Sequence, residues 1–348
     1  MQTILRTGAV AGLLVLAAAP YLHVDGARLG ILLTYTPRPV VAAAAAIAAG
    51  VFAARRFWTP SACSVIATIL ALGALSWGGG GAPMPAQRKV SPAARVWTLI
   101  AANIHNSAEA IAALRTIVSK EQVDFLVLQE VRLNRREEVR DAFGEFEFWS
   151  FDPPFGKKPA SSGIYAGFTG VRRSLLFGPT NVTVRAAITG YRTFAIEIRG
   201  RDWRLSIVNV HATKPLWTEN GWLTAVVRAG WSSGWHLSEA RRLAEWIDAQ
   251  TKTPLIVAGD FNAPHYAWAI RTLGLQEAHA AAGHGPHLTW PSWLPLMDPD
   301  HVLASPDVAF LDYRTVKLPG SDHRAQIVRF AIRKYVYVPV DEAGKNPS

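Results

Sequence analysis

The segment LIVAGDFN, residues 255–262, contains the clearest structural pattern in the chain. Four apolar residues and a glycine form a short run that is typical of a buried strand. The run ends directly in Asp260 and Asn262. An Asp or Asn after a strand is usually a turn residue that bonds its own backbone. Two such polar groups directly after a buried strand also suit a functional site, and both interpretations stay open at this point.

The same pattern recurs on both sides of this segment. Other apolar runs end in, or begin beside, polar residues, namely Asn103, Glu130, Asn209, His211, Asp300, His301, Asp322 and His323. Each residue alone has an ordinary explanation, such as a turn, a solvated helix start or a core histidine. Strand ends on one side of a sheet can converge, however, and groups of these types could then bind a divalent cation and a phosphate together.

Short strands outnumber long helices in the predicted pattern. Asn106 or Ser107 can cap one helix, and residues 235–250 have the spacing of an amphipathic helix. We therefore predict an α/β (α+β) four-layer sandwich, in which two packed mixed β-sheets are flanked by helices.

The composition restricts the class of protein. Half of the 348 residues are hydrophobic and only 18% are charged, which excludes a disordered chain. The single cysteine, Cys63, excludes an internal disulfide framework and a zinc cluster built on thiolates. The net charge of +10 favours anionic partners, either nucleic acid or lipid headgroups.

Much of the apolar excess lies near the N-terminus, in runs at 8–22, 39–54 and 61–77. We predict that residues 1–80 form a membrane anchor of three transmembrane helices, although each run is near the lower length limit for a span. A cleaved signal peptide in the first run and buried helices of a soluble core are the alternatives. The remaining predicted parts are a Gly/Pro linker over 81–94, a large domain over 95–335 and a tail over 336–348.

The orientation of such an anchor depends on its basic flanks. Arg55 and Arg56 favour a cytoplasmic loop between the second and third spans, which would place the large domain outside the cytoplasm. Arg88, Lys89 and Arg95 favour the opposite orientation. We predict a location in the cell membrane with the large domain extracytoplasmic.

Six blocks in a fixed order carry a resemblance to a known family: ANIHN, LVLQEV, IVNVHA, VAGDFN, DPDHVLAS and GSDHRA. Over residues 95–332 this order resembles the endonuclease/exonuclease/phosphatase superfamily, which has the deoxyribonuclease-like fold. The HLTWP segment at 287–291 and the N-terminal apolar runs resemble a membrane-anchored bacterial branch of it. The resemblance implies a hydrolase of phosphoric esters in which residues 95–335 are the catalytic domain.

The resemblance also implies a metal site. Glu130 would be the main Mg²⁺ ligand, assisted by Asn103 and Asp322, with Mn²⁺ as the alternative ion. The metal would polarise a phosphate oxygen and neutralise charge in the transition state.

Further roles implied by the resemblance concern the attacking water and the phosphate. Asp260 would orient or deprotonate the water, and His323, held by Asp300, would contact the phosphate in its protonated form. His211 would contact the phosphate from the opposite side, while Asn209 and Asn262 would donate hydrogen bonds to it or fix the site. His301 is expected to be structural.

The substrate stays open between several classes. The basic charge favours a nuclease, whereas the apolar N-terminal runs and four tryptophans in 216–235 favour a lipid or phosphoinositide headgroup. The tryptophans could instead pack in a surface loop. Arg172-Arg173 and Lys157-Lys158 are candidate phosphate contacts, although solvated charges are the simpler explanation. A non-catalytic binding protein of the same fold is the remaining alternative, and no protein partner is evident.

Overall fold

The computed structural model describes residues 2–22, 34–75, 95–150, 165–176, 182–185, 192–200, 203–215, 222–250 and 253–332. The predicted linker 81–94, the predicted tail 336–348 and the Lys157-Lys158 pair lie outside these residues.

Two β-sheets of six strands each form the centre of the described part of the large domain. The first sheet has the order β11 (Val308–Lys317), β12 (Arg324–Ile332), β1 (Val96–Asn103), β2 (Phe125–Arg132), β4 (Tyr165–Arg172) and β3 (Phe146–Trp149). The second has the order β5 (Val182–Arg185), β6 (Phe194–Arg199), β7 (Arg204–His211), β8 (Leu255–Asp260), β10 (Asp300–Ala304) and β9 (Gln276–Glu277).

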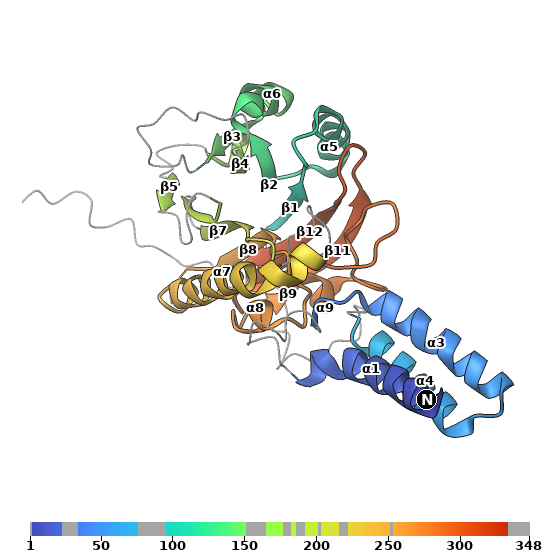
Figure 1. The fold of residues 1–348 in the computed structure, drawn as a ribbon. Helices are drawn as coiled ribbons and strands as arrows, with labels where there is room; N and C mark the ends of the chain where they lie inside the picture. The colour runs from blue at the N-terminus through green and yellow to red at the C-terminus, as the bar shows by residue number, and fades with distance from the viewer. Residues whose placement is uncertain are drawn as a thin grey trace, which may run out of the picture.

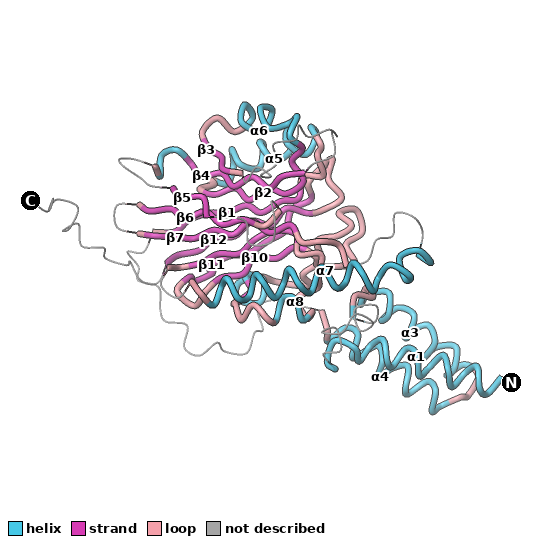
Figure 2. Tube along the Cα trace, turned by 60° about the vertical axis from the view of Figure 1, so that its left-hand side comes forward, coloured by secondary structure: helices cyan, strands magenta, loops and turns pink. Residues whose placement is uncertain are grey.

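Helices cover the outer face of each sheet (Figures 1 and 2). On the first sheet these are α5 (Ala108–Glu121) and α6 (Arg136–Ala142), and on the second α7 (Trp222–Asp248) and α8 (Trp268–Arg271). A shorter helix, α9 (Ala278–Ala282), follows β9. Two packed mixed sheets flanked by helices confirm the predicted sandwich.

The interior has three apolar layers. Residues from both sheets, such as Leu99, Phe125, Ile207 and Ile256, form the central layer. The outer layers lie beneath the helices. The near-continuous apolar runs read in the sequence reflect this double burial, because a strand between two layers is covered on both faces.

One parallel pair in each sheet sets the position of the predicted site residues. β1 runs parallel to β2, and β7 runs parallel to β8. Parallel strands end at the same edge of a sheet. The polar residues near the ends of β1 and β2 therefore lie together, as do those at the ends of β7 and β8. His211 and Asp260 are direct neighbours in this register.

Two helix starts can be compared with the prediction. Ser107 caps α5, and its hydroxyl accepts a hydrogen bond from the Ala110 amide at 3.2 Å, which confirms the predicted cap. The predicted helix over 235–250 begins earlier, at Trp222. Most of the tryptophan-rich segment 216–235 is therefore helical, although residues 216–221 lie outside the described part of the chain.

The N-terminal part contains three helices, α1 (Gln2–Leu22), α3 (Arg38–Ala54) and α4 (Trp58–Gly73). None of the described helices is both long and apolar enough to cross a bilayer, so the predicted transmembrane segment within residues 1–80 is wrong. α3 and α4 have 17 and 16 residues, or about 26 and 24 Å at 1.5 Å per residue, against a hydrocarbon core of about 30 Å. α1 has 21 residues, but Arg6 and Thr7 lie in its first turns.

These helices pack on one another and on the sandwich. Small side chains, among them Ala17, Ala45 and Ala67, are buried between the three helices. The Tyr35 hydroxyl and His236 Nε2 on α7 share a hydrogen bond at 3.0 Å, and Arg38 Nε donates to the Tyr266 hydroxyl at 2.9 Å. The small residues of the apolar runs are thus buried between the helices, whereas larger ones such as Ile47 and Ile69 are exposed. The predicted location of the catalytic domain stays a prediction.

Candidate functional site

The ends of four strands from both sheets bring Asn103, Glu130, His211 and Asp260 together in one buried group of polar side chains, which is referred to below as the pocket. Asn103 Nδ2, at the end of β1, donates to Asp260 Oδ2, at the end of β8, at 3.1 Å. His211 Nε2, at the end of β7, lies 3.5 Å from Glu130 Oε1 in β2. All four residues are buried. The structure therefore brings these four predicted site residues together.

Glu130 occupies an irregular position in β2. The register with β4 shifts between Leu128 and Val131, and Glu130 has a positive φ of 57°. Positive φ is uncommon for a residue other than glycine, and strained backbone of this kind gathers at functional sites. His105, Asn106 and Asn262 also have positive φ, between 47° and 50°. These unusual conformations all lie around the same strand ends.

His323 and Asp300 form a buried pair beside this cluster. His323 Nδ1 lies 2.8 Å from Asp300 Oδ2, which also accepts a hydrogen bond from the Thr289 hydroxyl. Although burial lowers the pKa of His323, the charges of Asp300 and Asp260 raise it to about 10. The imidazole therefore carries a positive charge at neutral pH.

Asp260 lies between these groups and is fully buried. Its Oδ1 accepts from the Asn262 amide at 2.9 Å, and its Oδ2 lies 3.9 Å from His323 Nε2. Burial raises the pKa of Asp260 to about 7, although the charge of His323 lowers it. This carboxyl group can therefore take up and release a proton near neutral pH.

His211 differs from His323 in its protonation. Burial lowers the pKa of His211 to about 4, even though the Glu130 carboxylate nearby raises it. At neutral pH the ring is uncharged, so any contact of His211 with a phosphate is that of a neutral imidazole.

The two asparagines hold the surrounding backbone. Asn209 Nδ2 donates to the carbonyls of Leu128 and Phe168 at 3.1 Å each, and its Oδ1 accepts from Gln129 Nε2 at 2.9 Å. These bonds join β7 to β2 and β4 across the two sheets. Asn262 Nδ2 donates to the Ala212 carbonyl at 2.9 Å. Both amide groups thus bond to backbone near the pocket.

Asp322 lies at the edge of this group of residues, and its side chain is 41% exposed. Two residues without an assigned role in the sequence contact it. His105 Nδ1 lies 3.3 Å from Asp322 Oδ1 and 3.4 Å from Glu130 Oε2, and Trp290 Nε1 donates to Asp322 Oδ2 at 3.0 Å. The position of His105, two residues after Asn103, was the signal that could have revealed it. Trp290 is the tryptophan of the HLTWP segment.

The donors around Glu130 fit a divalent metal ion. Glu130 and Asp322 present carboxylates to the same ring of His105, and Asp322 Oδ1 is a buried atom that makes no hydrogen bond within the described residues. The Asn103 side-chain oxygen accepts one bond, from the His105 amide at 3.0 Å, and retains a second lone pair. Carboxylate and amide oxygens are the ligands that hard divalent cations prefer. Glu130, His211 and Asp260 also offer donor atoms within 4.8 Å of one another.

Arg172 and Arg173 do not join this pocket. Their Nε atoms donate to the carbonyls of Val123 and Phe146, respectively. In the register of the first sheet, Val171 pairs with Phe125, the first residue of β2, whereas Glu130 is near the last. The two arginines therefore lie at the opposite end of the sheet.

Comparisons with known proteins identify the family and the fold. The model of the Endonuclease/Exonuclease/phosphatase family matches residues 100–323. No match was found among curated proteins.

Similar solved structures include the human Nocturnin catalytic domain with bound sulfate, at 17% identity over 71% of this chain and 97% of that chain, with a TM-score of 0.50. A mannosyl-6-phosphatase of Bacteroides thetaiotaomicron has 12% identity over 68% of this chain and 100% of that chain, with a TM-score of 0.51. An endonuclease/exonuclease/phosphatase protein of Bacteroides vulgatus has 15% identity over 68% and 99%, with a TM-score of 0.50. At sequence identities this low, the structural similarity shows a shared fold and does not extend to function.

Proposed function

Since this chain belongs to the Endonuclease/Exonuclease/phosphatase family and is a hydrolase that acts on phosphoric ester bonds, we propose that it cleaves a phosphodiester in the presence of Mg²⁺ by in-line attack of water. The observation that carries the proposal is the pairing of Asp260 with His323, whose side chains lie 3.9 Å apart at their nearest polar atoms. Burial and mutual charge give this pair one group that titrates near neutral pH and one that stays cationic.

Asp260 is the proposed base. A carboxylate with a pKa of about 7 accepts a proton from water more readily than an ordinary aspartate does. The Asn262 amide and the Asn103 side chain each donate to one of its oxygens, so its orientation is fixed. Each oxygen still has a lone pair to accept a hydrogen bond from the attacking water.

His323 is the proposed cationic contact for the phosphate. Its Nδ1–H donates to Asp300, which leaves Nε2–H directed toward the pocket near Asp260. An N–H donor on a charged ring forms strong hydrogen bonds to anionic phosphate oxygens. Asn209 and Asn262 are proposed to hold the pocket, since the side-chain NH₂ of each donates to backbone carbonyls.

Glu130 and Asp322 would hold Mg²⁺, with the Asn103 oxygen as a further ligand. The ion, when bound, supplies a Lewis acid that polarises the phosphate and offsets developing charge. His105 is proposed to lie at the edge of this metal site, because it contacts both carboxylates. His211 would donate a hydrogen bond to the phosphate in its neutral form.

A nucleic-acid phosphodiester is the proposed substrate class. Trp290 is 37% exposed and bonds to Asp322, and the nearby Trp293 and Leu294 are 73% and 48% exposed. An exposed aromatic surface beside a phosphate site suits base stacking, and the net charge of +10 suits a polyanion. The lipid-headgroup alternative rested on the tryptophans of 216–235 and on a membrane anchor, and no described helix is long and apolar enough to be that anchor.

The proposal can be tested by replacing Glu130. We expect Glu130→Gln to reduce Mg²⁺-dependent kcat/KM on bis(p-nitrophenyl) phosphate by about 100-fold or more, because the main proposed metal ligand loses its charge. Glu137→Gln, on the exposed face of α6, is the matched control and should act like wild type. Full activity of Glu130→Gln, or equal activity of wild type in Mg²⁺ and in chelator, would refute the metal assignment.

The substrate class needs a separate comparison. The wild-type chain should hydrolyse single-stranded DNA or RNA faster than p-nitrophenyl phosphate, inositol phosphates or phospholipid vesicles in the same buffer. Trp293→Ala should raise KM for the polynucleotide and leave hydrolysis of the small diester unchanged. A preference for a monoester or a lipid would overturn the substrate class and leave the phosphoesterase assignment intact.

A further inference from the structure

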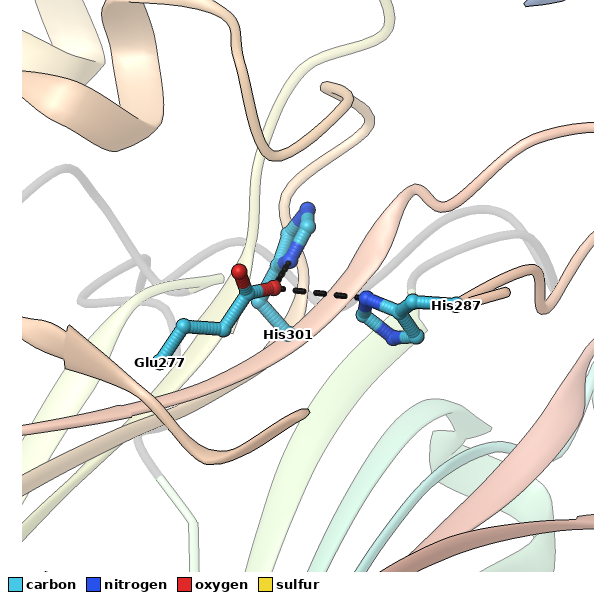
Figure 3. Close-up of side chains that lie close together, drawn as sticks. All are labelled: Glu277, His287 and His301. Carbon is cyan, nitrogen blue, oxygen red and sulfur yellow. Dashed lines mark hydrogen bonds and ion pairs between the residues drawn. The ribbon is translucent and has the colours of Figure 1, made fainter. Parts of the chain in front are cut away.

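A second cluster of ligand-type side chains lies apart from the catalytic pocket. It consists of Glu277 at the end of β9, His287 in the loop after α9, and His301 in β10 (Figure 3). One donor atom from each residue lies within 4.8 Å of the other two. Successive residues of a strand face opposite sides of the sheet, so His301 faces away from the pocket that Asp300 faces.

His287 is the residue that ordinary packing leaves unexplained. Its side chain is completely buried, yet neither ring nitrogen makes a hydrogen bond to any residue that the structure describes. Its Nδ1 lies 3.3 Å from Oε1 of Glu277 (Figure 3). A buried polar group without a partner is rare, because it has lost its bonds to water and gained none in exchange.

His301 is oriented in the way that metal-binding histidines are. Its Nε2 lies 2.8 Å from the Ala263 carbonyl, and its Nδ1 lies 2.7 Å from Oε1 of Glu277. A carbonyl and a carboxylate only accept, so without a metal ion both ring nitrogens carry hydrogens, and a bound ion would take the place of the hydrogen on Nδ1. A hydrogen bond from the second ring nitrogen to a carbonyl is the usual way to fix a histidine ligand.

Aromatic contacts fix the rings of this cluster. The His279 ring stacks on His287 with centroids 4.8 Å apart, and the rings of Tyr313 and His301 meet His287 edge-on at 5.4 Å. Rotation of His287 to find another partner would disrupt these contacts. The donor atom of His287 therefore stays directed at the same point as those of Glu277 and His301.

We propose that Glu277, His287 and His301 bind a Zn²⁺ ion, or a transition-metal ion of similar preference, at a site separate from the catalytic metal. Two imidazole nitrogens and a carboxylate oxygen form a donor set typical of Zn²⁺. Bonds of about 2.0–2.1 Å in a tetrahedral site place ligand atoms about 3.3 Å apart. The His287–Glu277 distance of 3.3 Å matches this spacing, and the His301–Glu277 distance of 2.7 Å would open slightly.

An ion pair without metal is the alternative explanation. A protonated His301 beside Glu277 accounts for the 2.7 Å contact, but His287 then meets the same Glu277 oxygen only at 3.3 Å, and its Nε2 has no hydrogen-bond partner among the described residues. A metal ion accounts for all three residues. The site would also anchor the loop that carries Thr289 and Trp290, whose side chains bond to Asp300 and Asp322 in the catalytic pocket.

The experiment uses the full chain with Glu130→Gln, which weakens metal binding at the catalytic site. After chelator treatment and dialysis against Zn²⁺, we expect one tightly bound zinc per chain by elemental analysis. Co²⁺ in place of zinc should give the visible absorption of a tetrahedral site. We then add His287→Phe, which keeps a ring for stacking, to the Glu130→Gln chain. This second substitution should weaken zinc binding by about 100-fold or more and abolish the rise in Tm that zinc causes.

The exposed His284, in the same loop, provides the control. His284→Gln in the same background should bind zinc like the parent. If His287→Phe does not fold, Glu277→Gln gives the same readout. Equal zinc content in parent and variant, or no bound zinc in the parent, would overturn the proposal. None of these readouts depends on hydrolysis, so the outcome is independent of the proposed function.

Discussion

The charge of His323 offers a quantitative test of the pocket. Asp300 accepts from its Nδ1 at 2.8 Å and, after the opposing effect of burial, makes the largest contribution to a pKa of about 10. The difference from the ordinary value of 6.5 corresponds to about 5 kcal/mol in favour of the protonated ring, at about 1.4 kcal/mol per pH unit. Asp300→Asn removes the charge and keeps an oxygen for the hydrogen bonds from His323 and Thr289.

We expect the pKa of His323 in this variant to fall to about 8, since one adjacent opposite charge contributes roughly 1–3 pH units and Asp260 remains nearby. Hydrolysis requires Asp260 deprotonated and His323 protonated under the proposed mechanism. The wild-type profile of kcat/KM should then rise near pH 7 and fall near pH 10, whereas the variant should already fall near pH 8. At pH 9 only about a tenth of the variant would carry the charged ring.

The assay is the steady-state kcat/KM on a small phosphodiester across this pH range in saturating Mg²⁺. Asp307→Asn, in the exposed turn after β10, provides a matched control and should keep the wild-type profile. An Asp300→Asn profile whose alkaline limb stays where the wild-type limb lies would refute the role of Asp300 in charging His323.

Three further changes concern stability, each measured by urea denaturation. Gly259→Ala should lower the free energy of unfolding by about 2–4 kcal/mol. Gly259 has a φ of 140°, and a Cβ there would overlap the Val210 carbonyl oxygen. The control Gly144→Ala, with open space around the new Cβ, should lower the free energy of unfolding far less. Asn209→Ala should cost about 2–4 kcal/mol, since its partners across the two sheets lose their bonds, and an unchanged midpoint would contradict this. Ser107→Ala should cost about 1 kcal/mol through loss of the α5 cap, and Ser107→Asp should restore most of it.

The sandwich and most of the pocket could be predicted from the sequence because one physical rule produces both. A strand covered on two faces is a continuous apolar run, and its end is where a polar side chain first becomes possible. Asn103, Glu130, His211 and Asp260 were found in this way, and the parallel pairing of β1 with β2 and of β7 with β8 brings them together.

Other residues do not stand at the end of an apolar run. Gln129 lies within the apolar run of β2, where sequence alone does not show which strand it will meet across the core. His105 and Trp290 reach Asp322 through turn geometry at positive φ and through a loop, neither of which follows a periodic pattern.

The N-terminal helices show the limit of hydrophobicity as a signal. An apolar run of alanines and valines, such as 39–54, is compatible with a bilayer span and with close packing of short helices on one another. No described helix is long and apolar enough for a bilayer span, and small residues such as Ala45 and Ala67 pack between the helices. The Tyr35 and Arg38 contacts with the sandwich join positions more than 200 residues apart, which the sequence alone does not reveal.

The joining of the two sheets by their strand ends has a consequence for how activity is gained and lost. Asn103 and Glu130 come from one sheet, His211 and Asp260 from the other, and His323 returns from the first. A nascent chain that has not yet added β12 still lacks its partner strand for β1 and the His323 beside it, so its reaction centre is incomplete. Turnover therefore reports cooperative assembly of the whole sandwich, and during denaturation it should vanish together with the native spectrum.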